Sequence, residues 1–291
     1  MTNIALLREA LPYINQFKGK TFVIKFGGEI ADDEARLDSF CEELALCAQV
    51  GIRMVVIHGG GKQANELSEQ LGIEPRKING RRITDEQTLD VVKMVFAGKI
   101  NTEILGSLRK SGIHAVGLTG VDGQLLTAHK RPPQVLVDAA TGEQKTVDFG
   151  FVGDILDVET KLIETLLAGD FVPVIASLAA NDEGEIFNVN ADTVASVIAC
   201  ALKAEKLIVA TNVDGVLDHN KQVLNRLNAA TIDQLKRDKV ITGGMIPKVD
   251  SALAALREGV HSFHIINGMK SNSLLSEIFT EQGCGTMIVL Q

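Results

Sequence analysis

The sequence predicts an α/β protein in which a mostly parallel sheet is covered by helices on both faces. Short β-branched runs alternate with amphipathic helical stretches along nearly the whole chain. With 291 residues and 45% hydrophobic content, the chain can form one large domain or two lobes that share a sheet. Most expected strands end in a turn rich in Gly, Asn or Asp. Because ligands of open α/β sheets bind beyond the carboxyl ends of the strands, these turns are where we expect the functional site.

The predicted elements follow one another in a regular order. An amphipathic helix over Ile4–Phe17 comes first, and a helix in that place must dock on its own domain or on a neighbouring subunit. The segment Val121–Gly153 interrupts the alternation and predicts hairpins laid over one edge. Its turns are marked by Asp122-Gly123, Pro132-Pro133 and Thr141-Gly142. The expected strands are Thr21–Phe26, Met54–His58, Ala115–Leu118, Val172–Ala176, Leu207–Thr211, Ser262–Ile266 and Thr286–Leu290.

Composition narrows the class of partner. The formal net charge is -8, with 37 acidic and 29 basic residues, and no run is rich in Lys and Arg. Nucleic acids and membrane surfaces both need a basic footprint, so we expect neither as a partner and favour a small-molecule ligand. No apolar run is long enough to span a bilayer, and the first residues lack a signal-type apolar core. The cysteines show neither CxxC nor zinc-type spacing, which predicts free thiols in a reducing, cytoplasmic setting.

Two glycine turns are expected at the ends of the first two strands. In Lys25-Phe26-Gly27-Gly28, paired glycines let backbone N–H groups approach an anion and the lysine adds charge, although a simple turn explains this motif equally well. His58-Gly59-Gly60-Gly61 leads directly into a helix. Three consecutive glycines lose much conformational entropy on folding, which favours a ligand held against main-chain amides at the helix N-terminus. We interpret His58 itself as structural.

A third candidate lies late in the chain, in the segment Gly243–Lys248 (GGMIPK). Pro247 is placed where a helix is expected to start, and Lys248 falls in the first turn of that helix. The helix dipole favours anions at this end. A phosphate between the lysine and the amide groups therefore explains the lysine best, and a solvated side chain is the alternative.

Polar side chains in two other segments are candidate ligand contacts. The run Asn188–Asp192 (NVNAD) precedes an apolar helix, and because one residue suffices as the N-cap, the others are left for a polar substrate or a lysine. Arg82, in the expected loop Asn79–Asp85, can hold a carboxylate through a bidentate fork, although surface arginines are common. The chain has neither GxxxxGK[ST] nor GxGxxG after the first strand, which disfavours the P-loop and dinucleotide-binding readings.

These motifs resemble the amino-acid kinase family in kind and in order. They are KxGG after the first strand, HGGG after the second, NVNAD in mid-chain, then TNVDGV and GGMIPK. The combination of HGGG, NGRRITD and NVNAD is similar to the N-acetylglutamate kinases of that family rather than to aspartokinases or uridylate kinases. The resemblance covers nearly the whole chain. It implies a three-layer αβα sandwich with an extra N-terminal helix.

The resemblance also implies a reaction, in which ATP with Mg²⁺ phosphorylates the γ-carboxylate of N-acetyl-L-glutamate in the second step of arginine biosynthesis. Lys25 and Lys248 would stabilise the transition state, and Asp192 would hold both lysines in place. The implied substrate contacts are Gly60, Gly61, Arg82 and Asn188. The implied nucleotide contacts are Gly27, Gly28, Thr211, Asn212, Gly215, Gly243, Gly244 and Met245. No protein side chain is expected to bind the metal.

Elementary chemistry agrees with these implied roles. The γ-carboxylate is ionised at neutral pH, so the reaction needs no general base and no protein nucleophile. The barrier lies in bringing one anion onto another. Positive charge and alignment are therefore what the protein must supply, and the lysines and glycine amides are groups of that kind.

Three regions are implied by the same resemblance: residues 1–20 as an oligomerisation helix, 21–203 as the amino-acid-substrate lobe, and 204–291 as the nucleotide lobe. The two lobes would share one sheet. One departure concerns the nucleotide lobe, where Asn212 replaces the family's usual aspartate. This leaves the detailed nucleotide contacts open.

Regulation by L-arginine is a further hypothesis. The N-terminal helix and the tail Leu274–Met287 resemble an arginine-inhibited subgroup that forms hexamers as trimers of dimers, and a plain dimer is the alternative. The hypothesis rests on Glu277, Gly283 and Gly285. The segment Gly268–Asn272 reads GMKSN, however, where that subgroup usually has Gly-Arg-x-Pro-His.

Two other functions fit many of these motifs. A kinase for aminoadipate attached to an acidic carrier protein shares most of the motifs, but it would need a basic docking surface beside the substrate loop. A non-catalytic arginine or nucleotide sensor of the same fold would be expected to lack one of the two lysines. Both lysines are present.

Overall fold

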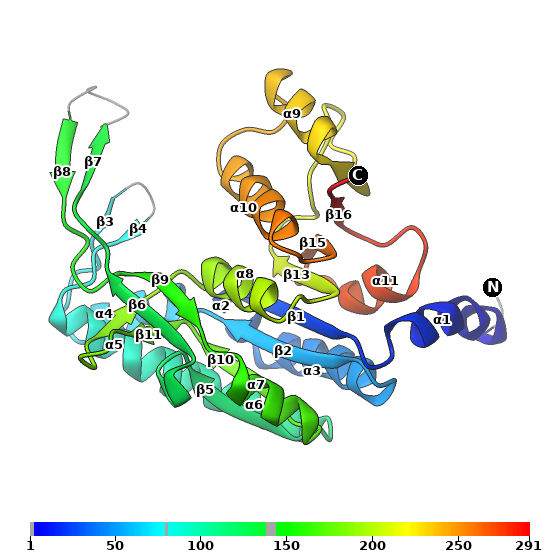
Figure 1. The fold of residues 1–291 in the computed structure, drawn as a ribbon, viewed down its shortest axis with the longest axis horizontal. Helices are drawn as coiled ribbons and strands as arrows, with labels where there is room; N and C mark the ends of the chain where they lie inside the picture. Colours follow the sequence, from blue (N-terminus) through cyan, green and yellow to red (C-terminus); the bar gives the residue numbers. More distant parts are fainter. Residues whose placement is uncertain (1–2, 79–80, 138–143) are drawn as a thin grey trace.

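An eight-stranded sheet runs through the molecule in the order β14-β16-β15-β13-β1-β2-β10-β5 (Figure 1). The computed structural model describes residues 3–78, 81–137 and 144–291, so the predicted turn residues Asn79-Gly80 and Thr141-Gly142 lie outside the described part. Neighbouring strands are parallel except β15 and β16, which are antiparallel. The strands are β1 (Thr21–Phe26), β2 (Arg53–His58), β5 (Ala115–Thr119), β10 (Val172–Ala176), β13 (Lys206–Thr211), β14 (Arg226–Asn228), β15 (Ser262–Asn267) and β16 (Thr286–Val289). The predicted mostly parallel sheet is confirmed.

Helices cover both faces of this sheet because its strands are apolar on both sides. Phe22, Ile24 and Phe26 of β1 join the core on one face, and Val23 joins the core on the other. The first face is covered by α1 (Asn3–Phe17), α2 (Gly28–Ala31), α3 (Glu34–Gln49), α4 (Gly61–Gln70), α5 (Glu86–Lys93), α6 (Asn101–Lys110) and α11 (Ser273–Phe279). The second is covered by α7 (Lys161–Ala168), α8 (Ala191–Ala201), α9 (Ala229–Arg237) and α10 (Met245–Arg257). The three-layer αβα arrangement is the predicted fold class.

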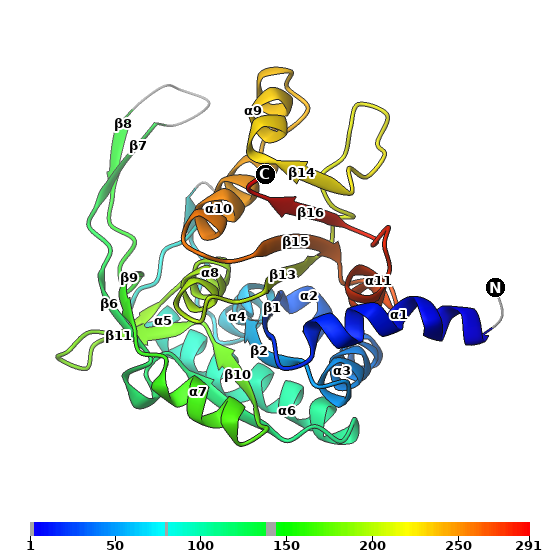
Figure 2. The ribbon, with the colours of Figure 1, turned by 45° about the vertical axis from the view of Figure 1, so that its right-hand side comes forward.

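A β-ribbon forms an arm beside the body of the molecule (Figures 1 and 2). The segment that we predicted as hairpins instead forms one long ribbon, because β6 pairs with β9 and, farther out, β7 pairs with β8. At its base the ribbon joins two strands that the sequence did not predict, in a second sheet of order β12-β11-β6-β9. These elements are η2 (Asp122–Gln124), β6 (Leu126–Lys130), β7 (Gln134–Val137), β8 (Gln144–Val147), β9 (Gly153–Val158), β11 (Leu178–Ala180) and β12 (Ile186–Asn188).

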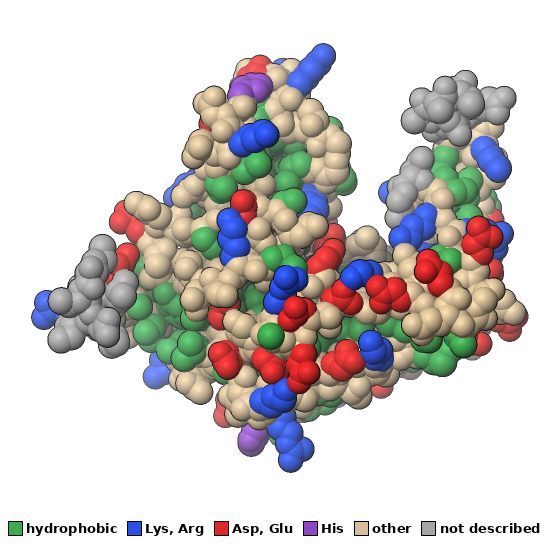
Figure 3. Space-filling model, turned by 180° about the vertical axis from the view of Figure 1, so that it is seen from behind, with side chains coloured by type: hydrophobic (Ala, Val, Ile, Leu, Met, Phe, Trp, Pro, Cys, Tyr) green, Lys and Arg blue, Asp and Glu red, His purple; other side chains and the backbone are tan. Residues whose placement is uncertain are grey.

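The surface is hollowed between the ribbon arm and the part of the body that carries α9 (Figure 3). Basic and acidic side chains are mixed on the face shown there. At the other end of the molecule α1 extends away from the body (Figure 2), and it contacts α11. In the described part of the chain, no helix has the length and apolar character to cross a membrane.

The strand register places the two glycine turns side by side. Phe26 of β1 and Ala176 of β10 are both paired with His58 of β2, so the residues that follow these strands emerge at one edge of the sheet. The short α2 begins at Gly28 and α4 at Gly61, so both turns run straight into helices. The carboxyl edge of the sheet is thus where the predicted site residues of the N-terminal half converge.

Two small features beside this edge were not predicted. The hairpin of β3 (Lys77–Ile78) and β4 (Arg81–Arg82) consists of strands too short to give a period-two pattern. The π-helix η1 (Met94–Ile100) joins α5 to α6, and single π-helical turns occur frequently at functional sites. The π-helix packs against the second glycine turn. A Cβ on Gly60 would fall 2.2 Å from Ile100 Cδ1 and 3.0 Å from the Phe96 ring.

Candidate active site

A cavity of about 520 Å³ lies at the carboxyl edge of the sheet. Its walls come from both glycine turns, the β3–β4 hairpin, the base of the ribbon and the start of α8. Cationic side chains gather on the lining, while Glu29 is an acidic member of it. The cationic residues are Lys25, Lys62, Lys77, Arg81, Arg82 and Arg131. A concave site with this charge favours an anionic ligand.

The polar residues at the start of α8 have different roles. Asn190 is the N-cap, and its Oδ1 accepts hydrogen bonds from the N–H groups of Asp192 and Thr193. Asp192 is therefore free to form an ion pair with Lys25, in which Nζ and Oδ1 are 2.7 Å apart. The Lys25 side chain is only 14% exposed, so this carboxylate also fixes where the ammonium group lies. Asn188, the remaining polar residue of the motif, lines the cavity.

Lys248 reaches the same region from the other half of the chain. Its Nζ donates a hydrogen bond to Thr211 Oγ1 at 3.3 Å, which brings the start of α10 to the end of β13. Burial lowers the pKa of Lys248; the charge of Asp192 acts to raise this pKa, and the charge of Lys25 acts to lower it. The three charged groups are therefore close enough to interact electrostatically. The helix begins at Met245 rather than at the predicted Pro247. Proline fits anywhere in a first helical turn, where no intrahelical bond needs its missing N–H.

Arg82 is a half-buried cation whose Nη1 atom is itself buried. Its Nη2 donates to the Gly61 carbonyl at 2.6 Å, whereas Nη1 is buried and has no partner among the described residues. Burial lowers the pKa of Arg82, but a guanidinium group stays protonated in proteins. A buried donor atom that has no hydrogen-bond partner is unfavourable. The arrangement therefore suits a carboxylate ligand that would complete the Nη1 hydrogen bonds.

Two polar side chains that line the cavity come from the ends of β12 and β10, which belong to different sheets. Asn188, at the end of β12, donates from Nδ2 to Thr84 Oγ1 at 3.1 Å. Ser177 directly follows β10 and is 1% exposed, and its Oγ has no partner in the part of the chain that the structure describes. Ser177 is not among the site residues predicted from the sequence. The signal that was available is its position one residue past a predicted strand.

The predicted nucleotide contacts occupy two places. Gly27 and Gly28 lie on the cavity wall. The others lie at the end of β13 and in the turn after it, or at the start of α10. An added Cβ on Gly243 or Gly244 would meet nothing within 4 Å. Gly215 adopts φ +134°, and a Cβ there would meet Thr286 Oγ1 at 2.5 Å, so the turn after β13 requires glycine. Thr211 is the last residue of β13, Asn212 follows it, and Met245 is the first residue of α10. Their contact with a nucleotide remains a prediction.

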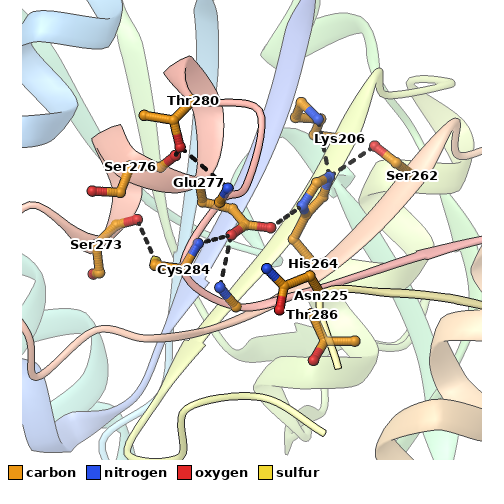
Figure 4. Close-up of polar contacts among 12 residues, drawn as sticks. Lys206, Asn225, Ser262, His264, Ser273, Ser276, Glu277, Thr280, Cys284 and Thr286 are labelled. Carbon is orange, nitrogen blue, oxygen red and sulfur yellow. Dashed lines mark hydrogen bonds and ion pairs between the residues drawn. The ribbon is translucent and has the colours of Figure 1, made fainter. Parts of the chain in front are cut away.

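The residues predicted for regulation form a separate buried cluster (Figure 4). Glu277 Oε2 accepts hydrogen bonds from the N–H groups of Cys284 and Gly285, both at 2.9 Å. Its Oε1 accepts from His264 Nδ1 at 2.7 Å, and Lys206 Nζ lies 3.0 Å from His264 Nε2. Burial would raise the pKa of Glu277, but these hydrogen bonds lower it overall. Gly283 closes the same turn with φ +61°.

A mostly parallel α/β sheet carries lysines and glycine turns around a cavity suited to an anion. This combination is that of an α/β protein that transfers phosphoryl groups. Comparison with known proteins agrees with that class. Residues 20–267 match the model of the amino acid kinase family. The chain therefore belongs to the amino acid kinase family.

Two relatives named acetylglutamate kinase match almost end to end and place the chain in that branch of the family. Acetylglutamate kinase of Methanocaldococcus jannaschii is 47% identical over 286 residues, which is 97% of this chain and 95% of the relative. Acetylglutamate kinase of Aquifex aeolicus is 47% identical over 289 residues, or 98% and 97% of the two chains. The family implies ATP as a substrate.

Solved structures extend the comparison to other members of the fold. N-acetylglutamate synthase from Neisseria gonorrhoeae, complexed with coenzyme A and N-acetyl-glutamate, matches with a TM-score of 0.84 and 29% identity. The match covers 100% of this chain and 64% of that chain, so this chain spans less than two thirds of the synthase. Giardia carbamate kinase, with a TM-score of 0.66 and 16% identity over 94% of this chain and 99% of the other, shares the fold.

Proposed function

We propose that this chain transfers the γ-phosphoryl group of ATP to the γ-carboxylate of N-acetyl-L-glutamate, giving N-acetylglutamyl 5-phosphate, the second step of arginine biosynthesis. The observation that carries the proposal is the convergence of Lys25, Lys248 and Asp192 beside an anion cavity. This convergence occurs in a chain that is 47% identical to acetylglutamate kinases over nearly its whole length.

The proposed mechanism relies on charge and alignment. Arg82 holds the α-carboxylate through the Nη1 donor, which has no partner among the residues that the structure describes, and Asn188 contacts the N-acetylamino group. The γ-carboxylate then lies against the second glycine turn, whose amides point at developing negative charge. Lys25 approaches from the acceptor side and Lys248 from the nucleotide side, and Asp192 holds both in place. The charge on the transferred phosphoryl group is spread over these donors in the transition state.

Magnesium enters the proposal with the nucleotide. In the described part of the chain no group of three or more His, Cys, Asp or Glu side chains is arranged to hold a metal ion. Mg²⁺ commonly keeps several waters and is held largely by substrate phosphates, so a site without a dedicated protein cage suits a metal carried by ATP. When bound there, it would neutralise part of the phosphate charge.

The test is an acyl-phosphate trap with hydroxylamine, run with ATP and Mg²⁺ on N-acetylglutamate, N-acetylaminoadipate, aspartate and glutamate. We expect hydroxamate to form with N-acetylglutamate far faster than with the other acceptors. Turnover that requires aminoadipate on a carrier protein would support the rival kinase instead. An enzyme preparation that binds ATP but gives no hydroxamate with any acceptor would support the sensor function and overturn the proposal.

The proposal also covers assembly and regulation. The chain acts as a cytoplasmic homo-oligomer, in which residues 21–203 form the substrate lobe and residues 204–291 the nucleotide lobe. α1 extends from the body with Leu11 46% exposed, which suits packing against a second copy in a dimer or hexamer. Phe17 at the end of α1 lies 5.0 Å from Lys206 Nζ, so the helix touches the cluster around Glu277.

L-Arginine is the proposed inhibitor at the junction of α1 and the Glu277 cluster. In support, the structure of N-acetylglutamate synthase from Neisseria gonorrhoeae complexed with coenzyme A and L-arginine matches this chain with a TM-score of 0.85 and 28% identity. The match covers 100% of this chain and 66% of the synthase. Deleting residues 1–20 should abolish both arginine inhibition and the larger assembly, as measured by the trap assay and light scattering. If millimolar arginine leaves both the rate and the half-saturating substrate concentration of the intact chain unchanged, this regulatory part is wrong.

A further inference from the structure

The second glycine turn rests on a buried polar chain that the proposed mechanism does not use. His58 is 0% exposed at the end of β2, and its Nδ1 lies 3.0 Å from the carbonyl oxygen of Gly59. On the other side of the ring, Nε2 lies 3.1 Å from Asn101 Nδ2. Asn101 is also buried, and it directly follows the π-helix η1. Its Nδ2 also donates to the Val174 carbonyl of β10 at 3.0 Å.

These contacts determine where the proton of His58 lies. A carbonyl oxygen can only accept, so the atom of Asn101 that faces Val174 must be the amide nitrogen. The same NH₂ group donates to His58 Nε2, which must therefore be the unprotonated ring nitrogen. Independently, Nδ1 faces the Gly59 carbonyl and must carry the proton. Both arguments give one neutral tautomer, and burial, which lowers the pKa of His58 to about 4, keeps the ring neutral at physiological pH.

The direction of a catalytic amide follows from this tautomer. In a trans peptide the C=O of Gly59 and the N–H of Gly60 point in opposite directions. His58 holds that C=O toward the buried core, so the Gly60 N–H is turned away from the core, toward the side where Gly59, Gly60 and Gly61 line the cavity. Among the described residues no protein acceptor is paired with the Gly60 N–H.

We propose that His58 and Asn101 are positioning residues, which lock the peptide between Gly59 and Gly60 so that its N–H is presented to the anionic substrate. The inference rests on the proposed phosphoryl-transfer function, because it assigns a purpose to an amide of that site. Glycine at 117 is part of the device. A Cβ at this position on the edge strand β5 would fall 2.0 Å from Asn101 Oδ1, so only glycine leaves the Asn101 amide in place.

The first experiment reads the tautomer in the intact enzyme without substrate, so its outcome does not depend on the proposed reaction. Long-range ¹H–¹⁵N NMR should show His58, assigned by its loss in His58→Asn, as a neutral ring protonated on Nδ1 and unchanged between pH 8 and about pH 5. A ring protonated on Nε2, or one that titrates near pH 6.5, would overturn the proposal.

The second experiment separates positioning from packing through two isosteric amides. His58→Asn places its amide N–H near the position of Nδ1 and can still bind the Gly59 carbonyl, whereas His58→Gln places its amide near Nε2. We expect His58→Gln to lower kcat about tenfold further than His58→Asn, with the KM for ATP within about twofold of wild type in both. Equal losses in the two variants would show that His58 only fills space.

The third experiment displaces Asn101 without touching the site. Gly117→Ala should lower kcat about tenfold and broaden or split the His58 NMR signal. The matched control is Gly106→Ala in α6, where an added Cβ meets nothing within 4 Å, and it should leave both readouts unchanged. If Gly117→Ala keeps wild-type kcat, or loses kcat with the His58 tautomer intact, Asn101 does not act through His58.

Discussion

The two edges of the main sheet carry the same kinds of residues but use them in opposite ways. At the carboxyl edge, Lys25 pairs with Asp192 beside a cavity, and Arg82 keeps a buried donor that has no partner within the described part of the chain. At the amino edge of the neighbouring strand, Lys206 lies against His264, which in turn donates to Glu277. Both of the Glu277 oxygens accept hydrogen bonds from the protein. Residue type alone therefore does not mark a site, whereas donors left open toward a cavity do.

The largest effect is expected when a lysine at the carboxyl edge of the sheet is removed. Lys25→Ala and Lys248→Ala should each lower kcat by roughly 10²–10³-fold, because each removes a charge that is needed most in the transition state. The hydroxylamine trap measures the rate, and circular dichroism should show that the fold is kept. The matched control is Lys62→Ala, since Lys62 lines the cavity but is engaged with Asp32. A Lys62 variant as slow as the other two would mean that the site depends on its overall charge rather than on two placed lysines.

The next effect concerns binding. Arg82→Ala should raise the KM for N-acetylglutamate by roughly 10–100-fold with a smaller change in kcat, because the α-carboxylate is held equally before and during the reaction. Arg81→Ala is the control from the same hairpin, since its guanidinium is directed to Gln134 Oε1 at 3.0 Å. Substrate saturation curves for both variants decide the matter. Normal half-saturation in the Arg82 variant would place the carboxylate elsewhere.

The main sheet could be predicted from sequence because each strand is an apolar run with turn residues at its end. Thr21–Phe26 and Val172–Ala176 match the observed β1 and β10, and the other predicted strands differ from the observed ones by a residue at one end. The strands that were missed, such as β11 and β14, have three residues and no readable period.

The candidate site was predicted as a set of motifs, but its support was not. Gly60 must be glycine because Phe96 and Ile100 press on it, and these residues come from a π-helix that has no signature in the sequence. The same holds for Asn101, which reads as an ordinary helical residue until the fold places it against His58. Motifs on strand ends can be read from the chain, whereas the residues that aim them depend on tertiary contacts.

The smallest effect tests the amino edge through pH. Burial lowers the pKa of Lys206 from 10.5 to about 8, although Glu277 and Glu205 act to raise it. Between these two values the unfolded chain binds more protons at this residue than the folded chain does, so the Lys206 contribution to stability must rise with pH. The Lys206 contribution to the free energy of unfolding is most unfavourable below pH 8, and this penalty has disappeared above about pH 10.5.

The measurement is the difference in unfolding free energy between wild type and Lys206→Met, from urea titrations between pH 7 and pH 11. Subtraction removes the thiols, which also titrate in this range. The difference should move in favour of wild type by about 3 kcal/mol across the window, while kcat at pH 7 stays close to that of wild type. A flat difference curve would mean that Lys206 is solvated like an ordinary surface lysine. The closed cluster that distinguishes this edge from the active one would then not exist in solution.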